Sequence, residues 1–303
     1  MSKPIAGVLP IVHTPFDDED RIDASALADE IDWAFRCGAD GCATGMVSEL
    51  LRLTYDERRF LTERLAELNQ GRGVFVASVG AESTKQAVEF ATHAERSGAD
   101  AVMAIPPTTT ALGNEQTAAY FRAIADSISL PVIVQDASAY VGRSISLSVY
   151  GELLDEYGSE RILFKPEASP IGPNLSALRE LSGGAARVLE GSGGILLVDS
   201  FRRGITGTMP GMELLDGIVA IWRALQNGDD DTAYRVYFPI CAIVALQMQA
   251  GLDGFLAIEK YVLRKRGVFR NEHRRSPNAW SLDQETAAEI DRLLGRMQQA
   301  LAE

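Results

Sequence analysis

The sequence predicts an α/β fold, a (β/α)8 TIM barrel with a C-terminal helical appendage. Three observations lead to this prediction. Strand-type apolar runs alternate with longer helical patterns along most of the chain. A short segment recurs after the length of two βα units, and the last part of the chain carries helical patterns only. Eight βα units match a closed barrel, whereas a doubly wound open sheet rarely has eight such strands in a row.

Eight short runs of strand-forming residues are expected to build the barrel wall. Between them lie the longer helical patterns, so the strands should run parallel. The predicted strands are residues 5–12, 41–45, 74–79, 101–105, 131–135, 162–165, 187–190 and 204–208.

The recurring segment marks the junction between a helix and the next strand. Residues 36–41 read Arg-Cys-Gly-Ala-Asp-Gly, and residues 96–101 read Arg-Ser-Gly-Ala-Asp-Ala. In both copies a glycine stands where a helix should end and a strand should begin. Each βα unit takes about 30 residues, so the spacing fits two units.

Other helices are predicted from caps and apolar periodicity. Residues 54–57 form a capping box before a helix with three leucines on one face. We expect the barrel to occupy residues 1–228 and the appendage residues 229–303. The appendage should contain three helices, at residues 231–251, 253–267 and 283–303, with a polar and basic loop at 268–281.

Composition narrows the class of protein. The chain has 303 residues, a formal net charge of -13 and a pI near 4.8, which disfavours a nucleic-acid binder because phosphates require a basic patch. No signal peptide and no membrane span of uninterrupted apolar residues is expected. The three cysteines make neither a metal-ligand pattern nor a disulfide framework. We therefore expect a cytoplasmic protein that binds neither nucleic acid nor membrane.

The active site of such a barrel lies at the carboxyl ends of its strands, and Lys165 ends the sixth strand. An amine held among apolar groups loses hydration, which makes its neutral, nucleophilic form accessible. Imine formation with a carbonyl substrate requires such an amine. The alternatives for Lys165 are an exposed lysine at a strand end, or a buried lysine that only pairs with Glu167.

The strand ends together resemble the dihydrodipicolinate synthase and N-acetylneuraminate lyase superfamily over essentially the whole chain. The resemblance rests on four segments: Thr14-Pro15-Phe16, the turn at residues 45–49 with Leu53, Thr54 and Glu57 after it, Phe164-Lys165-Pro166-Glu167, and the turn at residues 190–193. It implies that Lys165 forms an imine with a 2-oxo acid, without a cofactor or a metal, in a homotetramer built as a dimer of dimers.

The expected site residues fall into two groups. Glu167 and Glu49 are the carboxylates best placed to act as base and acid beside Lys165, although Glu49 is equally consistent with loop bracing. Asp136 is a third candidate base, but an aspartate after a strand commonly caps a turn. The substrate-binding residues expected at the strand ends are Met46, Val47, Ser48, Thr108, Gln135, Asp136, Gly191, Ser192 and Thr206.

Several positions differ from the usual pattern of the superfamily. Gln135-Asp136 replaces a tyrosine-asparagine pair, Met46 replaces the relay threonine, and Thr108 stands where a tyrosine is expected. The arginine that grips the aldehyde's carboxylate in synthases aligns with Tyr140. The pattern resembles more closely the branch that contains 2-keto-3-deoxy-L-arabonate dehydratase.

The resemblance thus favours a lyase that dehydrates or cleaves a 2-keto-3-deoxy sugar acid. Two alternatives stay open: a 4-hydroxy-tetrahydrodipicolinate synthase, and a retired barrel that only binds a sugar acid. The sequence leaves open the sugar acid, the choice between dehydration and aldol cleavage, and the identity of the base. No metal site is expected, because His13, His93 and His273 are scattered and lack an accompanying metal-binding motif.

Overall fold

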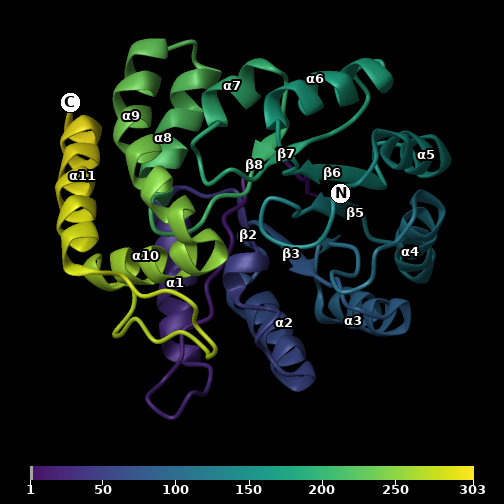
Figure 1. The fold of residues 1–303 in the computed structure, drawn as a ribbon, viewed down its shortest axis with the longest axis horizontal. Coiled ribbons are helices and arrows are strands. Elements are labelled where there is room, and N and C mark those ends of the chain that lie inside the picture. Colours follow the sequence, from purple (N-terminus) through teal and green to yellow (C-terminus); the bar gives the residue numbers. More distant parts are fainter. Residues whose placement is uncertain (1–2) are drawn as a thin grey trace. The chain divides into compact units, whose positions relative to one another are not determined.

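The structure, a computed structural model, describes residues 3–303. Within these residues eight strands, β1 to β8, alternate with helices α1 to α8, and α9 to α11 follow (Figure 1). The described chain divides into two compact units. The first contains the residues up to Ala6, Arg59–Gly191 and Asp199–Thr208, and the second contains Gly7–Arg58, Ser192–Val198 and Met209–Glu303. The domain boundary expected between residues 228 and 229 stays a prediction.

The first unit contains six strands that follow one another in sequence order. The strands are β3 (Val74–Ser78), β4 (Ala101–Ala104), β5 (Val132–Asp136), β6 (Ile162–Pro166), β7 (Leu189–Glu190) and β8 (Gly207–Thr208). The strands from β3 to β6 pair in parallel, and β7 pairs in parallel with β8. A parallel bridge between Phe164 and Val188 connects β6 with β7. The carboxyl ends of these strands therefore lie at one edge, where the sequence places the site.

Helices connect these strands, as parallel pairing requires. They are α3 (Thr84–Ser97), α4 (Asn114–Ser127), α5 (Leu147–Tyr157), α6 (Ile171–Leu181) and α7 (Leu197–Arg202). Their apolar faces are buried, as in α3, where Ala87, Phe90, Ala91 and Ala94 follow the spacing of one helical face. Helix α2 (Tyr55–Asn69) and helix α7 each cross the division between the two units.

The repeated Gly-Ala-Asp segment has the same structural role in both units. In the first unit Asp100 Oδ2 accepts a hydrogen bond from Phe75 N at 2.9 Å, and Asp100 N donates to Phe75 O at 2.8 Å. In the second unit Asp40 exchanges the same two bonds with Val8, at 2.8 and 2.9 Å. The glycine that begins each segment, Gly38 or Gly98, ends the preceding helix with a left-handed φ of 90° or 94°.

The second unit contains β1 (Gly7–Val8) and β2 (Gly41–Ala43), and a parallel bridge joins Ile11 to Ala43. Its helical elements are α1 (Ala24–Cys37), η1 (Met46–Ser48), α8 (Leu215–Gln226), α9 (Asp230–Gln247), η2 (Met248–Ala250), α10 (Gly251–Lys265) and α11 (Gln284–Ala302). The three predicted appendage helices correspond to α9, α10 and α11. Residues 268–281 contain no helix or strand, in agreement with the loop predicted there.

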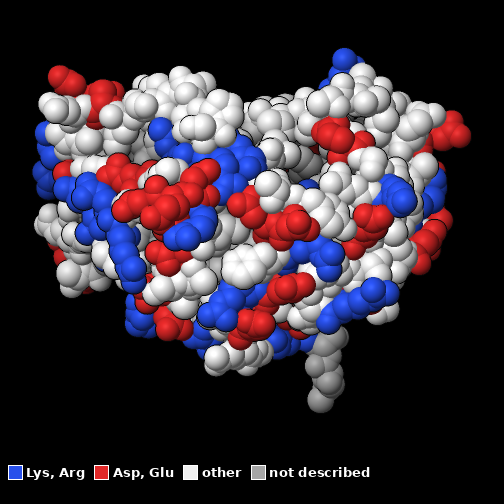
Figure 2. All heavy atoms as spheres, turned by 90° about the horizontal axis from the view of Figure 1, so that it is seen from below, with Lys and Arg blue, Asp and Glu red and all other residues white. Residues whose placement is uncertain are grey.

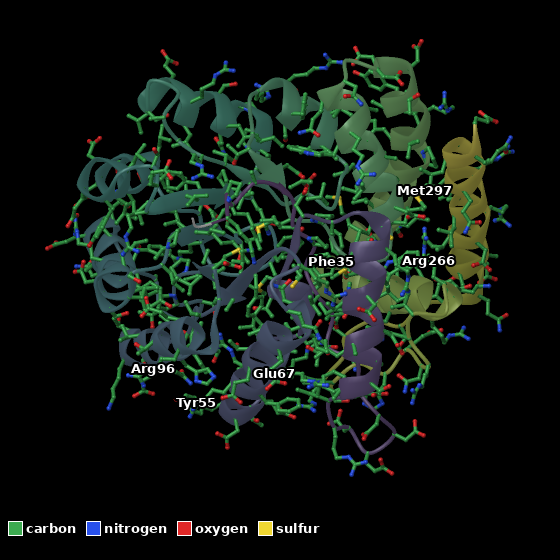
Figure 3. All side chains as sticks on the ribbon, turned by 180° about the vertical axis from the view of Figure 1, so that it is seen from behind. Phe35, Tyr55, Glu67, Arg96, Arg266 and Met297 are labelled. Carbon is green, nitrogen blue, oxygen red and sulfur yellow. The ribbon has the colours of Figure 1, made fainter. Side chains whose placement is uncertain are left out.

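Close packing at one glycine joins the C-terminal helices to α8. A Cβ atom at Gly217 would lie 2.8 Å from Ile240 Cδ1 of α9 and 2.9 Å from Met297 Sδ of α11. Figure 3 labels Met297, and Figure 1 shows α11 beside α9. The appendage helices therefore bury their apolar faces within the second unit instead of forming a core of their own.

The first predicted strand is longer than the strand observed. Residues 5–12 were expected to be extended throughout, but β1 covers only Gly7–Val8. Pro10 follows the strand closely and has no N–H group to donate to a ladder. Regular pairing therefore stops after two residues. It resumes only as the isolated bridge at Ile11.

One stretch is long and apolar enough to cross a membrane. It covers Asp230–Lys265, its most apolar window has a mean hydropathy of 1.5, and 50% of that window is buried inside the protein. Core helices of soluble proteins pass the same test of length and composition. The helix η2 and Gly251, with a φ of 55°, interrupt the stretch between α9 and α10.

Charged side chains of both signs are interspersed on the face that Figure 2 draws. The net charge of -13 comes from 42 acidic against 29 basic residues.

Candidate active site

Lys165 is buried at the carboxyl end of β6. Its side chain is only 5% exposed, and the residue pairs in register with Gln135 on β5. The interpretation of Lys165 as an exposed lysine at a strand end is therefore wrong. The two interpretations that remain are catalysis and a buried pair with Glu167.

Glu167 is the ionic partner of Lys165. Its Oε2 lies 2.9 Å from Lys165 Nζ, and it accepts a hydrogen bond from Gln135 Nε2 at 2.7 Å. Burial raises the pKa of Glu167, although the charge of Lys165 and the bond from Gln135 oppose that shift. A buried carboxyl whose pKa is raised in this way can exchange protons with a neighbouring amine.

Gly191 lies directly against this pair. A Cβ atom at position 191 would fall 2.6 Å from Lys165 Nζ and 2.6 Å from Glu167 Oε1. Contacts of that length are not sterically possible, so a larger residue would displace the amine or the carboxylate. The glycine is therefore required for the close approach of the backbone to the functional groups.

Thr206, another predicted binding residue, lies just before β8, and a buried hydrogen bond joins β7 to β8. Glu190 Oε2 accepts a hydrogen bond from Thr208 Oγ1 at 2.9 Å, and both residues are buried. Thr206 uses its hydroxyl to donate to Val188 O at 2.9 Å. Because that donation occupies the hydroxyl hydrogen of Thr206, the residue can offer a ligand only an acceptor oxygen.

Asp136 braces a loop. Its two carboxylate oxygens accept backbone N–H groups, from Ser138 at 2.9 Å and from Ile145 at 2.7 Å. Gln135, one residue earlier on the same strand, contacts Glu167. Successive strand residues point to opposite faces. The turn-capping alternative for Asp136 therefore accounts for both of its oxygens.

Thr108 is held by a carboxylate that sequence reasoning did not select. Glu82 Oε1 accepts from Thr108 N at 2.8 Å and from Thr108 Oγ1 at 2.6 Å, while Glu82 Oε2 accepts from the backbone and hydroxyl of Thr109. Burial raises the pKa of Glu82, but these four donors outweigh it and lower the pKa to about 2. Glu82 thus shapes the loop after β4.

The remaining predicted binding residues belong to the second unit. Met46, Val47 and Ser48 form η1 directly after β2. Ser48 Oγ donates to Val12 O and accepts from Gly45 N at 3.0 Å, so its hydroxyl holds the turn. Ser192 Oγ accepts from Leu196 N at 2.9 Å, in the turn before α7.

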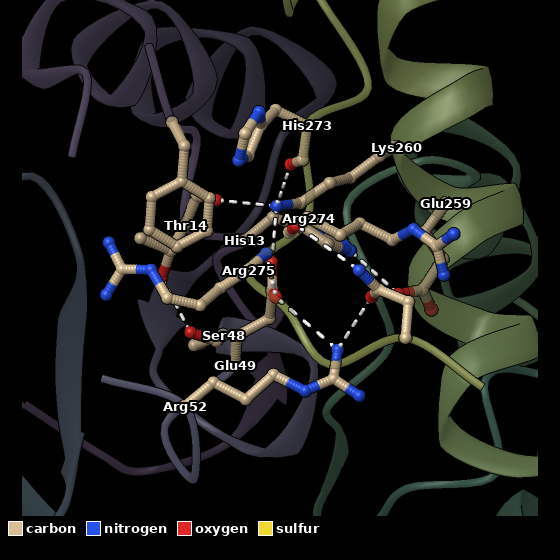
Figure 4. Close-up of polar contacts among 12 residues, drawn as sticks. His13, Thr14, Ser48, Glu49, Arg52, Glu259, Lys260, His273, Arg274 and Arg275 are labelled. Atoms are coloured by element: carbon tan, nitrogen blue, oxygen red, sulfur yellow. Dashed lines mark hydrogen bonds and ion pairs between the residues drawn. The ribbon is translucent and has the colours of Figure 1, made fainter. Parts of the chain in front are cut away.

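Glu49, which follows η1, is fully engaged in the second unit (Figure 4). Its side chain is buried, Oε1 contacts Lys260 Nζ, and Oε2 accepts from Arg275 N at 2.9 Å. Lys260 Nζ also donates to Thr14 O at 2.8 Å and to His273 O at 2.7 Å. Burial lowers the pKa of Lys260, while Glu49 opposes that shift. These contacts favour the loop-bracing alternative for Glu49.

A second buried cluster surrounds His13. His13 Nδ1 lies 3.0 Å from Glu30 Oε1, and His13 Nε2 lies 2.7 Å from Glu259 Oε2. Burial alone would lower the pKa of His13, but Glu259 and Glu30 raise it to about 10. Sequence reasoning missed Glu30, Glu259 and Lys260. A signal did exist for the last two, because they interrupt an apolar run within α10.

The structure thus brings together Lys165, Glu167, Gln135 and Gly191 by direct contact in the first unit. Asp136 and Thr206 lie on adjoining segments of the same unit but use their polar groups for local bonds. Met46, Val47, Ser48, Glu49 and Ser192 belong to the second unit. All three cysteines keep their thiols unbridged.

Comparison with known proteins gives the same family over nearly the whole chain. Residues 4–296 match the family model of the dihydrodipicolinate synthetase family. An L-2-keto-3-deoxyarabonate dehydratase from Azospirillum brasilense is 29% identical over 289 residues, which are 94% of this chain and 92% of the relative. A 4-hydroxy-tetrahydrodipicolinate synthase from Bartonella quintana is 34% identical over 142 residues, which are 46% of this chain and 47% of the relative.

Solved structures share the fold. A dihydrodipicolinate synthase from Rhodopseudomonas palustris superimposes with a TM-score of 0.86 at 25% identity, over 98% of this chain and 100% of the other. YagE, a prophage protein of Escherichia coli K12 solved in complex with pyruvate, gives a TM-score of 0.88 at 22% identity, over 97% and 99%. The predicted TIM barrel with C-terminal helices is confirmed. The chain belongs to the dihydrodipicolinate synthetase family and is a lyase of that family.

Proposed function

We propose that this lyase forms a Schiff base with a 2-oxo acid and dehydrates a 2-keto-3-deoxy sugar acid. The observation that carries the proposal is the buried pair of Lys165 Nζ and Glu167 Oε2, 2.9 Å apart beside a glycine at the end of β6. A binding pocket gains little from an amine that is costly to desolvate. An imine-forming site, by contrast, requires a desolvated amine as its nucleophile.

The pair offers a route to the neutral amine. A proton that passes from Lys165 Nζ to Glu167 Oε2 leaves an uncharged, nucleophilic amine and an uncharged carboxylic acid. The amine then attacks the ketone carbon. Loss of water gives the imine, and Glu167 is close enough to supply a proton to the departing oxygen.

Dehydration follows from the electron demand of the imine. The protonated imine at C2 draws electrons and acidifies the C3 hydrogens, so a carboxylate can take one of them and leave an enamine. The enamine electrons then expel the C4 hydroxyl group, which leaves as water once it receives a proton. We assign both proton transfers to Glu167, because Glu49 is committed to Lys260 and Arg275. The imine supplies the electron sink, so the proposal needs no cofactor.

The remaining predicted residues receive supporting roles in this proposal. Gln135 orients Glu167, Gly191 leaves room for the amine, and Thr108 borders the substrate. Asp136 and Glu49 brace loops that carry binding groups. A substrate contact is assigned also to Thr206, whereas Met46, Val47, Ser48 and Ser192 belong to the second unit and stay predictions from the sequence.

The dehydratase is favoured over a 4-hydroxy-tetrahydrodipicolinate synthase by the extent of the likeness. The Azospirillum dehydratase matches 94% of this chain, whereas the match to the Bartonella synthase covers 46%. Gln135 and Asp136 also stand where the synthase pattern has its relay tyrosine and asparagine. Aldol cleavage of the same class of substrate would begin with the same imine.

Borohydride trapping tests the Schiff base. Incubation with pyruvate and sodium borohydride should add the mass of reduced pyruvate to Lys165, as peptide mass spectrometry would show. Lys165→Ala should abolish trapping and turnover and keep the fold. The matched control is Lys85→Ala, because Lys85 is a lysine of the same unit whose side chain is 87% exposed. Wild-type protein without an adduct would instead support the retired, binding-only barrel.

The substrate class is tested by product analysis. Protein should convert L-2-keto-3-deoxyarabonate to its dehydrated 2-oxo acid, and six-carbon 2-keto-3-deoxy acids should be assayed in parallel. Release of pyruvate and an aldehyde would assign aldol cleavage. Turnover only with pyruvate and aspartate semialdehyde would assign the synthase and overturn the dehydratase.

We also propose that the protein is a cytoplasmic homotetramer, a dimer of dimers. Exposed aromatic side chains on α9 support an interface between subunits, since Phe238 is 64% exposed and stacks on Tyr234 with ring centroids 5.8 Å apart. Light scattering coupled to gel filtration should give the mass of four chains. Phe238→Ser should shift that mass downward, whereas Phe60→Ser, at another exposed phenylalanine, should leave it unchanged.

A further inference from the structure

Three ligand-type side chains converge inside the second unit at positions far apart in the sequence. His13, Glu213 and Glu259 each offer one ligand atom, and these atoms lie within 4.8 Å of one another. All three residues are buried. They come from three segments, namely the chain after β1, the turn before α8, and α10. Figure 4 shows His13 and Glu259 beside the network of Lys260.

Glu30 fixes the orientation of the His13 imidazole. Glu30 Oε1 accepts from His13 N at 2.9 Å and lies 3.0 Å from His13 Nδ1, so the Nδ1 side of the ring is fixed by one carboxylate. This arrangement leaves Nε2 directed at Glu259. Histidine ligands of metal ions are oriented in the same way, by a carboxylate on the ring nitrogen that does not bind the ion.

Glu213 has an unsatisfied oxygen. Its Oε1 accepts a hydrogen bond from Gln247 Nε2 at 2.8 Å, but among the described residues its Oε2 has no hydrogen-bond partner, although the residue is only 3% exposed. Burying a carboxylate oxygen without a partner costs free energy. The arrangement is therefore incomplete as an all-protein network.

The free oxygen of Glu213 and one oxygen of Glu259 lie beside the same glycine. A Cβ atom at Gly211 would lie 2.3 Å from Glu213 Oε2 and 2.8 Å from Glu259 Oε1, so both oxygens approach the same point. The absence of a side chain at Gly211 leaves that point open. Two carboxylate oxygens that face one position repel each other unless a proton or a cation lies between them.

The charge of the cluster also calls for a cation. One imidazole faces three carboxylates, those of Glu30, Glu213 and Glu259, and the nearby Lys260 is already committed to Glu49. Negative charge is therefore in excess among these buried residues. A divalent cation compensates that excess and binds the free oxygen in a single step.

We propose that the second unit contains a structural site for a divalent transition-metal ion, with His13 Nε2, Glu213 Oε2 and a Glu259 oxygen as its protein ligands. One imidazole and two carboxylates are suitable ligands for Zn²⁺ or Mn²⁺. Soft ions such as Cu⁺ prefer sulfur ligands, which this cluster lacks. The ion replaces the proton shared between His13 Nε2 and Glu259, and that proton leaves to solvent. Binding ties the chain after β1 and the turn before α8 to α10.

Metal content of the untagged protein tests the site. Wild-type protein dialysed against metal-free buffer should carry about one Zn²⁺ or Mn²⁺ per chain by plasma mass spectrometry, because all three ligands are buried and release of the ion would leave their charges unpaired. Glu213→Gln should lose the ion. Glu289→Gln is the matched control, because it changes a surface glutamate of the same unit that pairs with Arg292. The control should keep the ion.

Thermal unfolding supplies the second readout and protects the test against a variant that does not fold. Chelation should lower the melting temperature of wild-type protein by several degrees, and added Zn²⁺ or Mn²⁺ should restore it. Wild-type protein that holds no ion and whose melting temperature responds to neither ion nor chelator would overturn the proposal. Pyruvate trapping at Lys165 requires no ion, so a failure here is distinguishable from a failure of the Schiff-base proposal.

Discussion

Lys165 Nζ lies 2.9 Å from Glu167 Oε2, and the backbone of Gly191 closes the space beside both groups. The amine, the carboxylate and the glycine come from β6, the residue after it, and the residue after β7. Their contact places the nucleophile Lys165 within direct proton-transfer distance of its acceptor Glu167.

Replacing Glu167 by glutamine should impair turnover while preserving the fold. The amide keeps the size of the side chain but neither accepts a proton from Lys165 nor delivers one, so kcat should fall about 10²- to 10⁴-fold. Product formation measured by nuclear magnetic resonance would show the loss. Glu180→Gln, an exposed glutamate on α6, should retain wild-type kcat. Full activity of Glu167→Gln would assign the proton transfers to another group.

The pH profile should report the same carboxyl group. Because burial raises the pKa of Glu167 above its usual value of 4.5, its ionised form appears only at higher pH than for an exposed glutamate. A base must be ionised to act, so the acidic limb of kcat/KM should lie above pH 4.5 and should disappear in Glu167→Gln. A limb that persists unchanged in the variant would belong to a different residue.

A single methyl group at position 191 should block imine formation. The Cβ of Gly191→Ala would meet Lys165 Nζ and Glu167 Oε1 at 2.6 Å, so the amine must move out of reach of the substrate. Borohydride trapping should fall to background while circular dichroism stays native. Gly295→Ala serves as the control, because its Cβ meets nothing within 4 Å and alanine favours the helix α11. Normal trapping in Gly191→Ala would show that the close approach is dispensable.

Removing the ammonium group of Lys260 should destabilise the protein. Lys260→Met leaves the buried Glu49 with only the longer pair to Arg52, at 3.6 Å, and the loss of the buried ion pair should cost about 3 to 5 kcal/mol of unfolding free energy. Chemical denaturation would measure the change. Lys265→Met, where the lysine is 40% exposed and pairs with Asp291, should cost under about 1 kcal/mol. The double variant Lys260→Met/Glu49→Gln should recover part of the loss. Equal costs for the two single variants would refute the buried pair.

Replacing Glu82 by alanine should raise KM more than it lowers kcat. The carboxylate holds Thr108 and Thr109 by four hydrogen bonds, and Thr108 is a proposed substrate contact. The folded-state pKa near 2 lies below the unfolded value of 4.5, so this stabilisation is present above pH 4.5 and is lost as the pH falls toward 2. Steady-state kinetics of Glu82→Ala should show the KM effect. Glu115→Ala, at an exposed glutamate of α4, should show none.

Local patterns predicted the elements well. The alternation of apolar runs and helical periods gave all eight strands, and the Gly-Ala-Asp repeat marked two equivalent helix-to-strand junctions. These features depend on residues near one another in the chain, because turns, caps and periodicity are local properties. Lys165 was recognised for the same reason, since an ammonium group at the end of an apolar strand stands out within five residues.

The roles of Glu49 and Asp136 could not be assigned in that way. A carboxylate after a strand is compatible with catalysis, with a turn cap and with an ion pair, and the distinction depends on which donors reach its oxygens. For Glu49 the donor is Lys260, 211 residues away, and for Asp136 the donors include Ile145. Hydrophobic periodicity predicts which side chains are buried, but it does not predict which donor or ion will pair with a buried carboxylate.

The order of strands and helices, the acidic composition and the position of the reactive lysine follow from short-range chemistry, so the linear chain already contains them. The pairing of His13 with Glu259, of Lys260 with Glu49, and the contact of Gly191 with Lys165 exist only after folding. The physical reason is that burial makes an unpaired charge costly, so buried charges must find partners, and packing alone decides which distant group is within reach.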